Sequence, residues 1–337
     1  MSEREDLRSR LEAAGLSAEG VAAVLDRVRP AVVLEPAEHP PSGSGASRLG
    51  GSPDLPPDLA WPERPAFEDG AATAAAYLAA NEDPTQWWRR LDAAQQERIA
   101  EDHRVRAHRV AGTAPLSFVA QVDLAQVAAT GETHPELPTT GRLLFFYDLL
   151  EMPWGFAPGD AVGSRVLHDD TDVGALVRRD PPADLVALGS EGVLPEVVLR
   201  PRATLTAPPP GAGVLEGLLP DHDAEAYHEW SMTAMDEPGW DTHQVGGWPH
   251  QVQGDMQLEC ALVSAGHSTG DGRAFEDPVV RAAAEEEAPE WVLVLQVASD
   301  DDRGFMWGDS GFLYVWMRRK DLRERAFERA HLVLQCF

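Results

Sequence analysis

Residues 1–30 show apolar positions at the three- and four-residue spacing of amphipathic helices. These positions are Leu7, Leu11, Leu16, Val21, Val24, Leu25 and Val28. Gly15 interrupts the pattern, and Ser17 follows as a residue suited to cap the next helix. The pattern predicts two short helices that end before Pro30. We interpret residues 1–30 as an N-terminal helical segment that precedes the main domain.

Beyond this segment, short apolar runs indicate β-strands. In PLSFVAQVDL (115–124) apolar residues alternate, and GRLLFFYDLL (141–150) is almost wholly apolar, as expected for a strand buried on both faces. Further strands are predicted at 31–34, 165–169, 196–206, 291–299, 312–317 and 332–336. The number and spacing of these runs favour a fold with extensive sheet.

Three other stretches have helical character. Residues 85–110 are polar and helix-favouring, and they predict a surface helix or a pair of helices within a helical insertion at about 66–112. Residues 221–235 and 321–327 are also predicted to be helical, and a further helix opens at Asp277 and Pro278, because proline suits the first helical position. The helices therefore lie between groups of strands, as in an α+β protein.

The chain repeats an order of short motifs. GGSP at 50–53 corresponds to GGWP at 246–249, and PLSFVAQVDL corresponds to WVLVLQVASD (291–300), which aligns Gln121 with Gln296. GRLLFFYD and GFLYVWMR then align Gly141 with Gly311. We therefore predict an internally duplicated α+β fold with mostly antiparallel β-sheets and peripheral helices. The single domain of residues 31–337 would consist of two pseudo-repeats, at about 31–206 and 214–337.

The repeated glutamines have two interpretations. A glutamine in the middle of a strand usually completes a gap in backbone hydrogen bonding, and a ligand contact is the alternative. His243 and His250 flank the second Gly-Gly turn. Two equivalent halves would bring their loops to one seam, where a cleft is the default place for a binding site.

The composition restricts the classes of partner that the chain is expected to bind. Lys and Arg total 28 against 56 Asp and Glu, a formal charge of -28, which disfavours nucleic acid and anionic membrane surfaces and would suit a basic protein. Cys260 and Cys336 show neither disulfide-framework nor zinc-site spacing. The N-terminus is charged, and no apolar run approaches the length of a membrane span. We therefore expect a cytoplasmic protein.

Six ordered blocks resemble those of the YwqG-like bacterial proteins, a family of unknown function. The blocks are RLGGSPDLPPDLAWP, PLSFVAQVDL, LPTTGRLLFFYD, HQVGGWPHQVQGDM, MWGDSGFLYVWMRRKDL and FERAHLVLQCF, within residues 48–337. The resemblance implies an α+β fold with extensive antiparallel sheet and internal duplication. It implies no reaction, cofactor or catalytic residue.

The sequence does not match the common catalytic and metal-binding motifs. The acidic run 300–302 lacks the EF-hand pattern, and residues 221–229 read as an acidic surface helix because His222 and His228 are not spaced for one helical face. GDSG at 308–311 lacks the flanking motifs of a serine protease, and no Walker lysine is present. We predict no cofactor and no metal.

The leading hypothesis is a non-catalytic binding or protein-interaction module with a cleft between two pseudo-repeats, of which an immunity-type partner of a basic protein is one form. The candidate ligand-binding residues are Arg48, Gln121, His243, Gln253, Trp307 and Asp309. The alternative is a hydrolase or other enzyme that uses Arg48, His243 and Asp309 at the seam.

Overall fold

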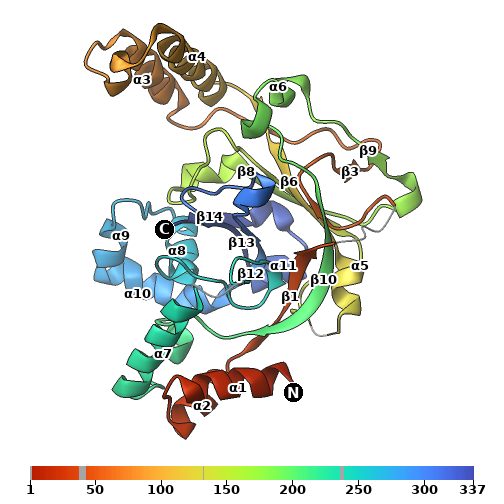
Figure 1. Ribbon diagram of the computed structural model, residues 1–337, viewed down its shortest axis with the longest axis vertical. Helices are drawn as coiled ribbons and strands as arrows, with labels where there is room; N and C mark the ends of the chain where they lie inside the picture. The colour runs from red at the N-terminus through yellow and green to blue at the C-terminus, as the bar shows by residue number, and fades with distance from the viewer. Residues whose placement is uncertain (1, 38–42, 132, 236–238) are drawn as a thin grey trace.

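A single curved sheet of ten strands organises the protein (Figure 1). The computed structural model describes residues 2–37, 43–131, 133–235 and 239–337. The strand order is β14-β13-β12-β11-β1-β10-β2-β6-β7-β8. Every neighbouring pair in this sheet is antiparallel. The predicted α+β class with mostly antiparallel sheet is thus confirmed.

The two longest central strands pair with each other and separate two wings. They are β1 (Arg29–Pro36) and β10 (Val197–Thr206). One wing consists of β11 (His243–Gly246), β12 (Trp291–Ala298), β13 (Phe312–Arg318) and β14 (His331–Gln335). The other consists of β2 (Arg48–Leu49), β6 (Ser117–Asp123), β7 (Arg142–Tyr147) and β8 (Ser164–Asp169).

The central strands are exchanged between the wings. Strand β1 precedes the wing that begins with β2, but it pairs with β11 of the other wing. Likewise β10 precedes β11 but pairs with β2. Two small sheets lie outside the main one, formed by β3 (Asp54–Leu55) with β9 (Val177–Arg178) and by β4 (Glu63–Arg64) with β5 (Ala114–Pro115). The exchange means that neither wing is complete without the strand that precedes the other.

The sheet curls until its two ends meet. His168 of β8 stacks on Phe327 at 5.5 Å, just before β14. The edge of β14 is covered by the loop after β7, where Leu334 donates its N–H to the Trp154 carbonyl at 3.0 Å. Gly155 is required there, because a Cβ atom would come within 1.9 Å of the Leu332 carbonyl oxygen. The main hydrophobic core, which contains residues of both wings, lies inside the curve.

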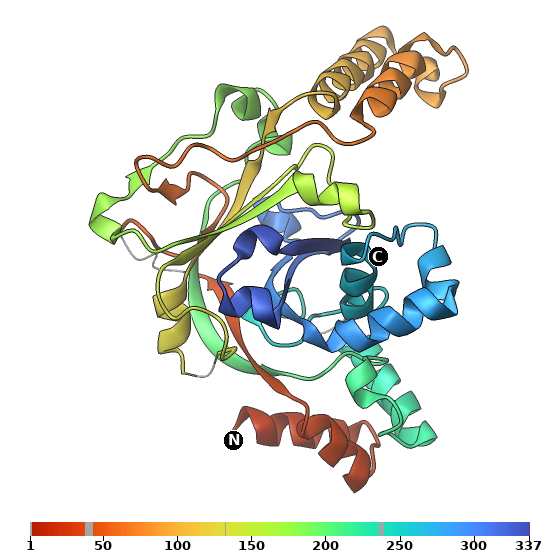
Figure 2. The same cartoon turned by 180° about the vertical axis from the view of Figure 1, so that it is seen from behind.

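Helices cover the outside of the sheet. The N-terminal pair is α1 (Glu3–Ala13) and α2 (Ala18–Leu25), which packs with α7 (Asp221–Ala234) around a small core of its own. Helices α8 (Met256–Ser264) and α10 (Pro278–Glu287) belong to a second cluster, with side chains from β12 to β14. Helices α3 (Gly70–Glu82) and α4 (Ala93–Val110) project from the body (Figure 2). The short helices are α5 (Leu124–Ala129), α6 (Ala183–Val186), α9 (Arg273–Glu276) and α11 (Arg319–Arg323).

Several local predictions are confirmed. Ser17 caps α2 by accepting a hydrogen bond from the Gly20 N–H, and Asp277 caps α10 with Pro278 at its start. Pro30, predicted to precede the first strand, lies within β1 instead. The helix predicted at 321–327 is wrong in its bounds, because α11 ends at Arg323 and a separate 3-10 turn begins at Phe327. Helices α5 and α8 were not predicted, because both are short and mostly apolar.

The acidic helix of residues 221–229 is less exposed than its composition suggests. The Asp223 side chain is fully buried and accepts hydrogen bonds from the N–H and Oγ of Ser17 at 2.7 and 2.6 Å. Burial opposes ionisation of this carboxyl, but the Ser17 bonds outweigh it and lower its pKa. Among the described residues, no helix is both long and apolar enough to cross a bilayer.

Candidate functional site

The buried side-chain amide of Gln296 holds together the two ends of the loop around the second Gly-Gly turn. Its Nε2 donates to the Thr242 carbonyl at 2.9 Å, and its Oε1 accepts from the His250 N–H at 2.9 Å. Gln244 lies directly opposite Gln296 on the neighbouring strand. One glutamine of β12 therefore brings Thr242, Gln244 and His250 to the same end of the sheet.

The turn between these residues depends on glycine. Gly246 and Gly247 have φ angles of 67° and 76°, in the left-handed region that other residues rarely adopt. A Cβ atom on Gly247 would also come within 2.6 Å of the Ala31 Cβ and of the Thr206 Oγ1. The two glycines thus let the chain reverse tightly against β1 and β10.

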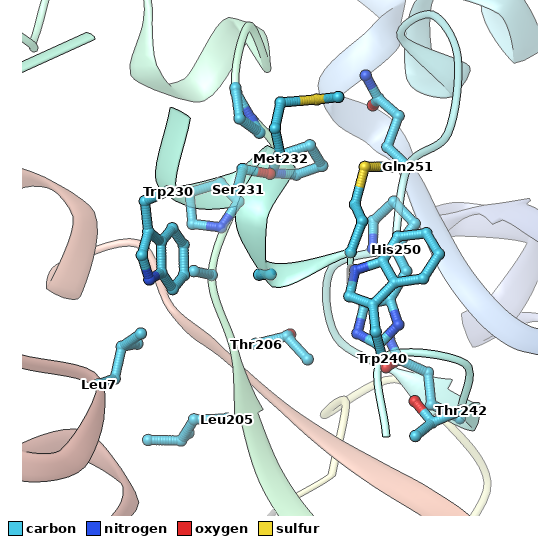
Figure 3. Close-up of a pocket in the computed structure, with 18 of the residues that line it drawn as sticks. Leu7, Leu205, Thr206, Trp230, Ser231, Met232, Trp240, Thr242, His250 and Gln251 are labelled. Carbon is cyan, nitrogen blue, oxygen red and sulfur yellow. The ribbon is translucent and has the colours of Figure 1, made fainter. Parts of the chain in front are cut away.

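A cavity of about 440 Å³ lies beside this turn (Figure 3). Its base is formed by residues of β1, β10 and β11, and its walls come from α1, α7, residues 207–210 and residues 239–253. Trp230 of α7 and Trp240 lie on opposite sides of it. The polar residues that line it include Thr206, Thr242, Gln244, His250 and Gln253. Its volume is in the range of small-molecule binding sites.

Three buried polar atoms of the lining residues have no hydrogen-bond partner within the described chain. They are Thr242 Oγ1, Gln244 Oε1 and His250 Nδ1. The Gln244 Nε2 donates to the carbonyls of Gly246 and Trp248 at 3.0 and 2.7 Å, so its oxygen is left as the free end. A buried polar group without a partner costs about 1–3 kcal/mol, and folded proteins contain few of them. Eleven such atoms occur among the described residues, and three of them belong to residues that line this one cavity, where water or a ligand can supply the missing partner.

The electrostatic character of the cavity differs from that of the whole chain. Among the described lining residues there is no Asp or Glu, although the chain has 56 of them. The formally charged lining side chains are Arg10 and Arg202. Arg10 lies over the Trp230 ring at 5.7 Å, and Arg202 binds Glu35 at 2.6 Å. The cavity is therefore a polar but weakly charged environment within a strongly acidic protein.

His250 is neutral at physiological pH. Burial lowers the pKa of its imidazole to about 4, and a hydrogen bond with the Trp240 backbone opposes this only in part. In a neutral imidazole one nitrogen is an acceptor, and Nδ1, which has no partner among the described residues, is available for that role. The ring also stacks on Trp240 with 5.3 Å between centroids. His250 thus offers an uncharged acceptor from a ring that packs against Trp240.

The first half holds the same backbone frame with different chemistry. Gln121 Nε2 donates to the Ala46 carbonyl at 2.9 Å, and its Oε1 accepts from the Asp54 N–H at 2.9 Å. Ala46 and Asp54 stand four residues before and after Gly50, just as Thr242 and His250 stand four residues before and after Gly246.

The position of Gln244 is taken by Arg48 in the first half. The Arg48 guanidinium binds the Asp54 carboxylate at 2.7 Å, and both side chains are only 2% exposed. The same Asp54 oxygen accepts from the Gly45 N–H at 2.7 Å. Around Gly50 the first half therefore satisfies its polar side chains internally, whereas Thr242, Gln244 and His250 around Gly246 each keep an unpaired side-chain atom.

The structure does not bring the six sequence-predicted site residues together. Only Gln253 lines the cavity, and its amide donates to the Cys336 carbonyl at 2.8 Å. Arg48 and Gln121 are engaged in the first half as described above. Trp307 is buried, donates to the Ala298 carbonyl at 3.0 Å and contacts Tyr147 edge-on.

The remaining two predicted residues lie apart as well. His243 Nδ1 accepts from the Ala298 N–H at 3.1 Å, and burial lowers the pKa of its ring to about 4. Asp309 has an exposed side chain. Arg48 belongs to β2 and His243 to β11, and the strands β1 and β10 lie between them. At the usual strand spacing, β2 and β11 are roughly 14 Å apart. The predicted enzyme set of Arg48, His243 and Asp309 does not share one site.

The cavity borders the second Gly-Gly loop, through Pro249 and His250, and its described lining does not include the first. Sequence reasoning did not single out Thr242 or Gln244. The available signal was their position relative to Gly246, which matches the positions of Ala46 and Arg48 relative to Gly50. That signal identifies equivalent positions but not which of them have unpaired atoms.

Two other kinds of site have less support in the structure. A hollow of about 500 Å³ lies against α3 and α4 and is lined mainly by apolar groups such as Trp87 and Ile99. None of the unpaired buried atoms described above belongs to it. No group of three or more His, Cys, Asp or Glu side chains suited to a metal ion occurs among the described residues.

Comparison with known families gives one match. A family model described as a domain of unknown function (DUF1963) matches residues 47–336. The matched region contains both Gly-Gly turns, both clamping glutamines and the loop that carries Thr242, Gln244 and His250. No curated protein matches the chain significantly. Because the model covers well over half of its length, the chain belongs to this family, the domain of unknown function DUF1963.

Proposed function

We propose that this chain is a non-catalytic binding protein and that its site is the cavity between α7 and residues 239–253. The observation that carries the proposal is that three residues lining a cavity of ligand size, Thr242, Gln244 and His250, each hold a buried polar atom without a partner in the described chain. An internal hydrogen-bond deficit is costly for the unliganded protein, and a bound group that completes the bonds offsets that cost.

Binding rather than catalysis is favoured by what surrounds His250. A nucleophile needs a base within hydrogen-bond distance, and the base needs a third group to orient it. The His250 Nδ1 has no hydrogen-bonded nucleophile, and the described lining contains no carboxylate, thiol or amine. The hydrolase alternative therefore has less support than the binding function.

The matching hydrogen bonds of two buried glutamines support a duplicated origin for the two halves of the chain. The clamps made by Gln121 and Gln296 engage backbone groups at the same offsets from Gly50 and Gly246. The mirrored strand order around β1 and β10 agrees with this. We also propose that the chain is a YwqG-like protein. The six blocks that carry this resemblance fall within residues 48–337, almost the same region as the family match.

A basic protein remains the second candidate partner, supported by the net charge of -28. Such a partner would be attracted to the acidic surface and not to the cavity, where the charged lining side chains are arginines. We also propose a cytoplasmic location. Cys260 and Cys336 are both free and buried, which agrees with a reducing compartment.

A fragment screen tests the binding function. Protein with ¹⁵N-labelled tryptophan gives ten indole signals, and Trp240→Phe and Trp230→Phe assign the two from the cavity walls. Fragments that bind in the cavity shift these two signals and leave the signal of Trp307, buried in the main core, unchanged. A library with neutral, anionic and cationic members that shifts neither Trp230 nor Trp240 would overturn the proposed function.

A further inference from the structure

The chemistry of the cavity also restricts its ligand, provided that the cavity is the binding site proposed above. We infer that the ligand places an uncharged, planar group with at least two N–H donors among Thr242, Gln244 and His250. A primary carboxamide and an amino-substituted heterocycle are the two commonest groups of this class.

The requirement for donors follows from the unpaired atoms. Gln244 Oε1 can only accept, because the nitrogen of the same amide already donates to two carbonyls. A neutral imidazole has one acceptor nitrogen, and the His250 Nδ1, buried without a partner among the described residues, fits that role. Thr242 Oγ1 can accept or donate. Two acceptors and one hydroxyl therefore match a group with two or more N–H bonds, whereas a carboxylate would offer them no donor.

The requirement for zero charge follows from the lining. A buried cation needs a carboxylate close by, and the described lining supplies none while it does contain Arg10 and Arg202. An anion would suit the arginines but would meet the lone pairs of Gln244 and His250. A neutral donor avoids both costs.

The requirement for planarity follows from the walls. Trp240 and His250 form a stacked pair on one side, and Trp230 stacks on Tyr227 at 5.4 Å on the other (Figure 3). Flat rings on facing walls favour a flat ligand. The three unpaired atoms are themselves almost inaccessible, so a ligand reaches them through small rotations of these side chains.

The first half provides an internal precedent for this chemistry. There a planar guanidinium, that of Arg48, donates N–H to Asp54, the residue that corresponds to His250. The same backbone frame, clamped by Gln121, thus already holds a planar N–H donor beside an acceptor at that position. In the second half, the residue at the Arg48 position is Gln244, whose free atom is an acceptor, so the donor has to come from the ligand.

Three probes with the same ring separate the possibilities: benzamide, benzoate and benzamidinium. Binding is followed by the indole signals of Trp240 and Trp230. The expected result is that benzamide shifts both signals at concentrations where benzoate and benzamidinium do not. Thr242→Val should weaken benzamide binding roughly fivefold to tenfold, the usual effect of losing one hydrogen bond.

A charge variant gives a second readout. Thr242→Asp adds a carboxylate to the lining of the cavity, so benzamidinium should now bind more tightly than benzamide. In the wild type, a preference for benzoate or benzamidinium would overturn the ligand class and leave the proposed function standing. The same holds if all three probes are silent while other fragments shift Trp240. If no fragment of any charge shifts Trp240 or Trp230, the proposed function itself fails.

Discussion

The backbone N–H of His250 donates to the side-chain oxygen of Gln296 at 2.9 Å. The two residues are 46 positions apart in the sequence, and this bond anchors the backbone that carries the His250 side chain. Its counterpart in the first half joins Asp54 to Gln121 at the same distance. The protein thus uses one buried glutamine in each half to place two side chains, and the chemistry of those side chains differs between the halves.

Removing the unpaired hydroxyl should stabilise the protein without its ligand. Thr242→Val replaces Oγ1, which has no partner, by a methyl group of similar size, so the free energy of unfolding should rise by about 1 kcal/mol. Thr206→Val is the matched control in the same cavity, because the Thr206 hydroxyl donates to the Arg29 carbonyl and accepts from the Trp248 N–H. That variant should lose about 1 kcal/mol. Urea unfolding measures both, and equal losses in the two variants would show that Thr242 is not deficient in hydrogen bonds.

The side chain of Gln296 should be needed to hold the cavity wall that carries Thr242 and His250. Gln296→Leu leaves the Thr242 carbonyl and the His250 N–H without their partner, which should lower the free energy of unfolding by about 2–4 kcal/mol. Gln121→Leu makes the equivalent change in the first half and should cost a similar amount. The variants differ at the cavity, because only Gln296→Leu should shift the indole signal of Trp240, which stacks on His250. A Trp240 shift of the same size in Gln121→Leu would contradict the separation of the two sites.

The contributions of Arg48 and Asp54 to the free energy of unfolding should be coupled. Arg48→Met removes the nearer of two guanidinium partners of the buried Asp54, since Arg178 stays at 3.5 Å, and should cost about 3 kcal/mol. The double variant Arg48→Met, Asp54→Asn should be more stable than Arg48→Met alone, because an amide needs no counter-charge while it can still accept from Gly45. A double-mutant cycle measures the coupling free energy. Additive effects of the two substitutions would mean that the pair contributes no coupling.

The stability of the protein should depend on pH through Glu259. Burial raises the pKa of this carboxyl to about 7 from an ordinary 4.5, against a hydrogen bond from Thr269 that lowers it, and nearby Asp255 raises it further. Between pH 4.5 and 7 the folded state binds this proton more tightly than the unfolded state does. The contribution is therefore fully present below about pH 4.5 and is lost as the pH rises to 7.

Glu259→Gln tests this dependence, because glutamine does not ionise and can still accept from Thr269. The variant should gain roughly 2–3 kcal/mol relative to the wild type between pH 4.5 and pH 8. Taking the difference between the two proteins cancels the opposite effect of the buried histidines. Glu285→Gln, on the exposed side of α10, is the control and should show no such trend. A flat difference for Glu259→Gln over this range would contradict the raised pKa.

Local patterns in the sequence predicted most of the elements correctly. Alternation and apolar runs located β6, β7, β12 and β13, and helical periodicity with Ser17 located α1 and α2. These predictions succeed because the period of an element and its cap are properties of a few consecutive residues. The bounds of the helix at 319–323 and the placement of Pro30 were wrong, because both depend on the pairing of neighbouring strands and turns.

The sequence by itself determined the repeated Gly-Gly turns and the two aligned glutamines, because backbone freedom at glycine and strand parity are local properties. Only the tertiary structure decided that β1 and β10 are exchanged between the wings. It also decided that Arg48 meets Asp54 while Gln244 and His250 keep free acceptors beside a cavity. The physical reason is that a hydrogen bond is satisfied or left open by every group around it, and here those groups come from α1, α7, β10 and β12, which are far apart along the chain.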